Sequence, residues 1–191
     1  MIPFLCEYFY RSYCMESIIV YGSCYGSAEK YAAELSVRTG IRAESFKTAV
    51  IPAECDAVVF IGSLYAGGAK GLKETVSKLK NVRWQKLIVC TVGLSDPDDS
   101  TNAANIRKGV LALLPAEWHE KAEIFHLRGG IDYSCLHFLH RLMMKLLYKN
   151  ALKIPEEKRT AEVKAMIETY GAKVDFIDFS RLAAVCAALN G

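Results

Sequence analysis

Short apolar runs alternate with helical segments along most of this chain, and this order constrains its fold more than any other feature. The predicted strands are residues 16–21, 41–46, 57–61, 87–92 and 122–127. Apolar residues three and four positions apart predict helices at residues 27–37, 71–79 and 102–114. Strands that alternate with helices in this way predict an α/β fold, a three-layer sandwich in which helices cover both faces of a five-stranded parallel sheet.

The order changes after the fifth strand. Residues 133–150 predict an amphipathic helix, and residues 159–170 predict a second, more polar one. A short extended segment at 174–176 and a last helix at 180–189 follow. We expect residues 15–191 to form one domain, with a basic amphipathic helix at about 134–150 inserted after strand five. Residues 1–14 are interpreted as an N-terminal arm or as a misassigned start upstream of Met15.

Composition excludes several classes of protein. The 191 residues are 52% hydrophobic, which is enough for a core, but no apolar run approaches the ~20 residues that cross a bilayer. The formal charge of +3 comes without a basic stripe interleaved with aromatics, so we expect no nucleic-acid partner. The seven cysteines have neither metal-site nor disulfide-type spacing, which favours a reducing, cytoplasmic location. We predict no metal site.

The loop at residues 22–28 lies between the first strand and the first helix. Its small and hydroxyl residues allow backbone N–H groups to surround a phosphate, and the helix start adds unpaired donors and a positive dipole end. It contains no Lys or Arg and lacks the spacing of a dinucleotide-binding or P-loop motif. These features favour a phosphate monoester that stays bound.

Two further loops lie at the same edge of the predicted sheet, where ligands of such folds bind. Residues 62–68 combine Tyr65 with a flexible glycine pair, Gly67 and Gly68, which suits stacking on a flat ring. Residues 91–97 follow strand four. Each loop alone is typical of an ordinary turn, but three together on one edge indicate a shared ligand.

The segments SCYGSA, GSLYAGG and TVGLSDP after strands one, three and four resemble the phosphate loop and the two ring-flanking loops of the flavodoxin-like family. The resemblance is closest to the group that includes the menaquinone-dependent protoporphyrinogen oxidases, whose basic, Leu/Met-rich inserted helix is similar to residues 127–150. It implies a sheet in the order 2-1-3-4-5 and one flavin mononucleotide (FMN), bound non-covalently.

The resemblance also implies the binding residues, in three groups. Around the phosphate it places Ser23, Cys24, Tyr25, Gly26, Ser27 and Ala28. On one side of the isoalloxazine ring it places Ser63, Leu64, Tyr65, Ala66, Gly67 and Gly68, and on the other Val92, Gly93, Leu94, Ser95 and Asp96. No catalytic side chain is implied, because the flavin carries the chemistry.

Two departures from the family keep alternatives open. Ala28 stands where the family usually has a hydroxyl residue, and the chain is slightly basic whereas typical flavodoxins are acidic. The expected function is FMN-dependent oxidation or reduction of a small molecule of the porphyrinogen or quinone type. The alternatives are an electron carrier between protein partners without its own substrate site, and a fold that has lost its flavin.

The predicted helix at 136–149 carries one cationic stripe and one apolar face. The stripe is His137, His140, Arg141, Lys145 and Lys149, and the opposing face is Leu139, Leu142, Met143, Leu146 and Leu147. One interpretation is a helix packed on the sheet edge with its basic side in water. The other is a surface helix that makes peripheral contact with an anionic membrane, a quinone pool or an acidic substrate. Surface tyrosines and the aromatic arm leave room for a homodimer.

Overall fold

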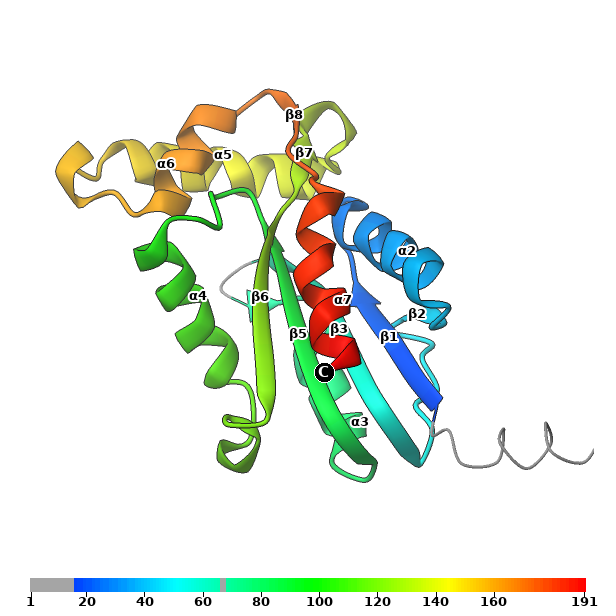
Figure 1. Ribbon diagram of the computed structural model, residues 1–191. Helices are drawn as coiled ribbons and strands as arrows, with labels where there is room; N and C mark the ends of the chain where they lie inside the picture. Colours follow the sequence, from blue (N-terminus) through cyan, green and yellow to red (C-terminus); the bar gives the residue numbers. More distant parts are fainter. Residues whose placement is uncertain (1–15, 66–67) are drawn as a thin grey trace, which may run out of the picture.

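The computed structural model describes residues 16–65 and 68–191, and its centre is a parallel sheet (Figure 1). The predicted arm at 1–14, and the site residues Ala66 and Gly67, lie outside the described residues. The parallel strands are β1 (Glu16–Gly22), β2 (Ala43–Ser45), β3 (Glu54–Tyr65), β5 (Arg83–Gly93) and β6 (Ala122–Arg128). Their order is β2-β1-β3-β5-β6, which confirms the predicted fold class and, among the parallel strands, the order 2-1-3-4-5.

Alternate residues of each strand face opposite layers of helices. Ile18 and Val20 of β1 pack in a cluster with α3 (Leu72–Leu79) and α4 (Ser100–Leu111), whereas Ile19 packs with α2 (Ser27–Thr39) and α7 (Leu182–Asn190). Figure 1 shows these two pairs of helices on the two faces of the sheet. The central strands are apolar on both faces because both faces are covered.

Residues 130–175 form a separate layer, the cap, across the carboxyl end of the sheet (Figure 1). It is inserted between β6 and α7 and contains a two-stranded antiparallel sheet and two helices. These are β7 (Gly130–Asp132), α5 (Phe138–Leu152), α6 (Ala161–Thr169) and β8 (Lys173–Asp175). The cap therefore lies over the strand ends at which the sequence places a ligand.

Two local predictions need correction. The helix predicted from about residue 134 begins at Phe138, because Asp132 caps a 3₁₀ turn at Tyr133–Cys135 and Leu136 is extended. The glycine-rich segment after β3 is not only a loop, since β4 (Gly68–Ala69) pairs antiparallel with Leu64 and Tyr65. Within the described residues, no helix is both long enough and apolar enough to span a bilayer.

Candidate functional site

The segment between β1 and α2 presents neutral hydrogen-bond donors at the start of a helix. Gly26 has φ 90° and precedes the helix, and its N–H donates to Ser23 Oγ at 2.9 Å. The N–H of Cys24 donates to Ser63 Oγ at 3.4 Å, which ties the loop to β3. The first N–H groups of α2 have no acceptor within the helix, and no side chain caps them. They remain donors for a bound anion.

Ser27 and Ala28 are both buried, and this limits how each could meet a phosphate. The Ser27 hydroxyl accepts from the Gly130 N–H at 3.0 Å, so it connects α2 to the cap. The Ala28 side chain is fully buried in the core between α2 and the sheet. The methyl group of Ala28 therefore contributes packing, and its side chain lines neither cavity beside the loop.

Two neighbouring cavities lie between the strand ends and the cap. The smaller is lined by Cys24, Tyr25, Ser27, Ser63, Leu64, Val92, Gly93, Leu94, Gly129, Gly130, Ile131 and Met144. The larger, of about 370 Å³, is lined by Leu64, Gly68, Ala69, Gly93, Leu94, Ser95, Asn105, Ile106, Gly109, Val110, Leu113 and Glu162. Leu64, Gly93 and Leu94 line both cavities, so the small compartment at the start of α2 and the wider one beside α4 share a wall.

The second predicted group of site residues is mostly strand rather than loop. Ser63, Leu64 and Tyr65 continue β3, and the backbone carbonyl of Ser63 accepts from the Lys70 N–H at 2.9 Å. This hairpin places Leu64 and Gly68 at the wall of the larger cavity. The side chain of Tyr65, like Ala66 and Gly67, lies outside what the structure describes, so ring stacking by Tyr65 stays a prediction.

The third group divides between β5 and the loop that follows it. Val92 and Gly93 belong to β5, and only Leu94, Ser95 and Asp96 lie beyond it. Ser95 is buried and its hydroxyl accepts from Asn102 Nδ2 at 2.8 Å.

The loop after β5 is held by one hydrogen bond within the loop and by one from the end of β6. Asp96 Oδ1 accepts from the Asp98 N–H at 2.9 Å, and the Leu94 carbonyl accepts from Arg128 Nε at 2.9 Å. These side chains fix the conformation of the loop beside the cavity.

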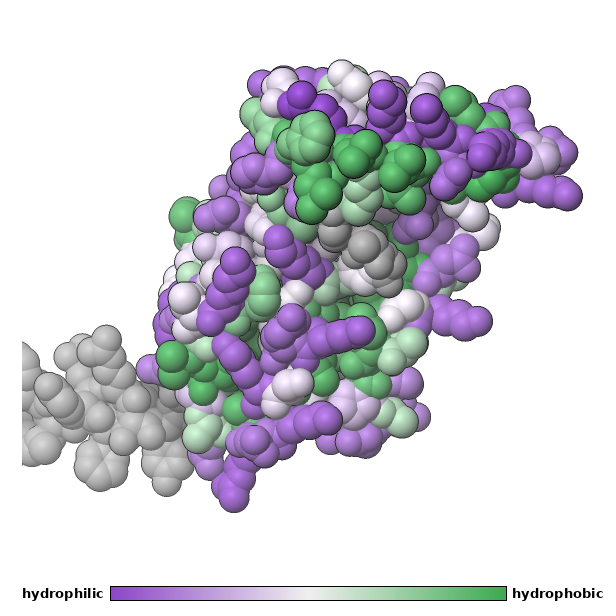
Figure 2. Space-filling model, turned by 180° about the vertical axis from the view of Figure 1, so that it is seen from behind, coloured by the Kyte–Doolittle hydropathy of each residue, from purple (hydrophilic) through white to green (hydrophobic). Residues whose placement is uncertain are grey.

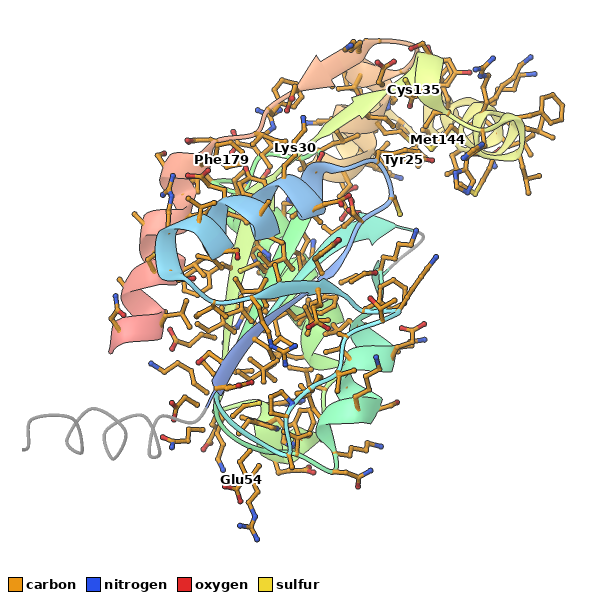
Figure 3. The ribbon with its side chains drawn as sticks, turned by 90° about the vertical axis from the view of Figure 1, so that its right-hand side faces the viewer. Tyr25, Lys30, Glu54, Cys135, Met144 and Phe179 are labelled. Atoms are coloured by element: carbon orange, nitrogen blue, oxygen red, sulfur yellow. The ribbon has the colours of Figure 1, made fainter. Side chains whose placement is uncertain are left out.

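The cap forms part of the wall of the smaller cavity through α5. The Tyr25 hydroxyl lies 2.6 Å from His140 Nδ1, and Met144 lines the cavity beside Tyr25 (Figure 3). The predicted cationic stripe therefore needs correction at His140, which is half-buried and contacts Tyr25 in the loop between β1 and α2. Tyr133 packs beneath α5 with its hydroxyl buried and without a partner among the described residues, and burial raises the pKa of Tyr133 to about 12.

Several residues that line the two cavities were not among the predicted site residues. Gly129 and Gly130 follow β6, and a Cβ at Gly129 would lie 2.8 Å from Val92 Cγ1 and 3.0 Å from Ser27 Cβ. The glycine pair is visible in the sequence directly after the fifth strand and could have been included. Met144 and Glu162 carry no such local signal, because only the packing of the cap brings them to the cavities.

A family model described as "Flavodoxin domain" matches residues 18–157. No curated protein matches the chain. Solved structures with a similar fold include a flavoprotein in complex with FMN from Lactobacillus acidophilus NCFM, with 13% identity over 60% of this chain and 93% of that chain, at a TM-score of 0.43.

Two other solved structures have a similar arrangement. One is an NAD(P)H:quinone oxidoreductase from Methanothermobacter marburgensis, with 10% identity over 83% of this chain and 98% of that chain, at a TM-score of 0.42. The other is oxidised flavodoxin 1 from Bacillus cereus, with 11% identity over 59% of this chain and 84% of that chain, at a TM-score of 0.37. All three TM-scores are low, so the fold assignment rests on the strand order and the family match.

Proposed function

Because this chain belongs to the Flavodoxin domain family, we propose that it binds one FMN non-covalently and uses it for redox chemistry on a small molecule. The observation that carries the proposal is the pair of neighbouring cavities at the carboxyl end of the sheet, which share Leu64, Gly93 and Leu94 as wall residues. One begins at the uncapped start of α2, and the other widens between β4, the end of β5 and α4. The family match supports FMN as the cofactor.

The smaller cavity fits the phosphate of FMN. The uncapped N–H groups at the start of α2 can donate hydrogen bonds to an anion. The Ser23 hydroxyl fixes the conformation of the loop before them by accepting from the Gly26 N–H. No Lys or Arg lines this cavity, so hydrogen bonds and the helix dipole would supply the binding energy. Burial of Ala28 accounts for the missing hydroxyl at that position without removing its N–H donor.

The larger cavity fits a flat ring system. Its volume of about 370 Å³ lies within the range of roughly 300–1,000 Å³ that is typical of cofactor sites. Leu64, Leu94 and Val110 supply apolar walls, while backbone amides at Gly68 and Gly93 supply donors for the ring edge. When bound there, FMN would accept and release electrons singly or in pairs. The protein orients the ring and excludes water.

The cap favours an enzyme over an electron carrier. Glu162 of α6 lines the larger cavity and Met144 of α5 lines the smaller one, so the inserted residues extend the walls beyond the strand ends. A carrier that meets protein partners directly has no need of such an enclosure, whereas a small-molecule substrate does. We favour a substrate of the quinone or porphyrinogen type, and the resemblance to menaquinone-dependent protoporphyrinogen oxidases supports this choice.

Titration with FMN and riboflavin tests the cofactor assignment. We expect saturable quenching of FMN fluorescence and clearly weaker binding of riboflavin, which lacks the phosphate. In the variant Ser23→Asp, the new carboxylate can still accept from the Gly26 N–H but repels the phosphate. Its affinity for FMN should fall at least about tenfold, because like charges at contact distance repel by more than 1 kcal/mol.

Riboflavin supplies the control for that variant. Its weak binding should be equal in the unsubstituted protein and in Ser23→Asp, since no phosphate is involved. Equal binding of FMN and riboflavin by the unsubstituted protein would contradict the phosphate site.

Steady turnover tests the enzyme assignment. With FMN bound, the purified protein should oxidise a porphyrinogen over many cycles when a soluble quinone is added as electron acceptor, or reduce that quinone when NAD(P)H is added as electron donor, without any protein partner. Turnover that appears only after a protein partner is added would favour the carrier instead.

A further inference from the structure

The outward face of α5 is apolar and unpartnered within the described part of the chain. Phe138, Leu142 and Leu146 follow one another at helical spacing, and Leu139 lies beside them. Phe138 is 82% exposed and Leu139 is 71% exposed, well above what a packed helix shows. We name these four residues the outer face of α5. Figure 2 shows a hydrophobic patch near the top of the molecule, at the height where Figure 1 places α5.

The opposite side of α5 packs against the rest of the protein. His140 contacts Tyr25, Met144 lines the smaller cavity, and Ala151 is buried. Tyr148 stacks on Tyr170 of the turn after α6, with ring centroids 3.9 Å apart. The helix is therefore held in place by one side, and its outer face is free to meet a partner.

Charge defines that partner. Residues 133–155 contain no Asp or Glu but carry four cations, namely Arg141, Lys145, Lys149 and Lys153. All four are exposed, and no carboxylate in the described ranges forms an ion pair with any of them. An exposed apolar strip flanked by unpaired cations matches the boundary between anionic headgroups and acyl chains.

We propose that the outer face of α5 docks on an anionic lipid bilayer, with its apolar residues in the interface and its cations on the headgroups. A second copy of this chain fits the same face less well. A symmetric pair built on this face would set one cationic helix against another, and residues 133–155 offer no Asp or Glu to compensate. The proposal does not depend on FMN, because it concerns only the exposed side of the helix.

Co-sedimentation with vesicles tests the proposal. The protein should pellet with vesicles of phosphatidylcholine and phosphatidylglycerol, and much less with phosphatidylcholine alone. In the variant Arg141→Gln/Lys145→Gln/Lys149→Gln, partitioning should fall by about fivefold for each cation removed. In Leu142→Gln/Leu146→Gln, partitioning onto the anionic vesicles should fall by about tenfold or more, since this variant loses both apolar side chains that would enter the membrane interface.

Matched variants on elements other than α5 serve as controls. Lys73→Gln/Lys80→Gln/Lys121→Gln removes three exposed cations, and Val37→Gln removes a side chain that is 82% exposed. Both should partition like the unsubstituted protein. All these positions are exposed, so circular dichroism and the thermal midpoint should stay unchanged in every variant.

A spectroscopic measurement gives a second, independent result. Trp84 and Trp118 pack against each other away from α5, so the added emission of Phe138→Trp reports on the outer face. It should shift to the blue with anionic vesicles and not with neutral ones. Absence of binding to anionic vesicles would overturn the proposal. So would a dimer in sedimentation velocity that Leu142→Gln/Leu146→Gln dissociates without any change in vesicle binding.

Discussion

At the scale of single residues, one half-buried histidine makes stability depend on pH. His126 of β6 lies beside β5, and its Nδ1 is 2.7 Å from the Thr91 hydroxyl. Burial lowers the pKa of His126, a hydrogen bond with the Ala103 backbone opposes the shift, and the Arg107 guanidinium adds to it. The folded protein therefore favours neutral His126.

This direction predicts a loss of stability in mild acid. The unfolded chain takes up a proton near pH 6.5, whereas folded His126 does so only at lower pH, so its contribution is present above about pH 6.5 and lost below it. Urea midpoints at pH 7.5 and pH 5.5 should differ less in His126→Asn than in the unsubstituted protein. An equal difference in both proteins would show that another group causes the acid sensitivity.

At the scale of elements, α4 links helix capping to the wall of the larger cavity. Asp99 caps the helix by accepting from the Asn102 N–H at 2.9 Å, and Asn102 Nδ2 donates to Ser95 in the loop after β5. Loss of this cap would loosen the first turn of α4 and the loop together.

We therefore expect Asp99→Ala to lower the free energy of unfolding by about 1 kcal/mol. It should also weaken FMN binding, because Ser95 lines the larger cavity. Asp99→Asn keeps an oxygen acceptor at the cap, so it should retain most of the stability and most of the affinity for FMN. Chemical denaturation and FMN titration of the two variants measure these effects, and equal losses in both would argue against capping as the cause.

At the scale of the whole molecule, the sheet and the cap differ in how many of their large side chains are buried. The interiors of β3 and β5 are almost fully buried, whereas α5 and α6 bury few large side chains. Ala151 is the only buried residue of α5, and its other contacts are partial. Local opening should therefore begin in the cap.

Hydrogen exchange measured by mass spectrometry tests this difference. Amides of residues 138–169 should exchange well before those of β3 and β5. If FMN binds as proposed, it should slow exchange in the first half of α5, because His140 contacts Tyr25 and Met144 lines the smaller cavity. Simultaneous exchange of cap and sheet would mean that they unfold as one unit.

The sequence by itself determined the sheet and the edge of the sheet at which the candidate site lies. The run at 57–61 and the run at 87–92 are apolar at every or nearly every position, which only a strand covered on both faces requires. The loop at 22–28 joins a strand to a helix, so local spacing alone places Gly26 and the helix start at the carboxyl edge. These features are local, and a single sequence contains them.

Only the tertiary structure decided how the cap completes the site. His140 was expected among outward cations but contacts Tyr25, Ser27 was expected at a phosphate but also holds Gly130, and Leu142 stays exposed on α5. The helical spacing of α5 fits either orientation, since apolar and basic residues occur around most of the helix. Contacts between residues more than a hundred positions apart choose between those orientations, and periodicity along the chain carries no information about them.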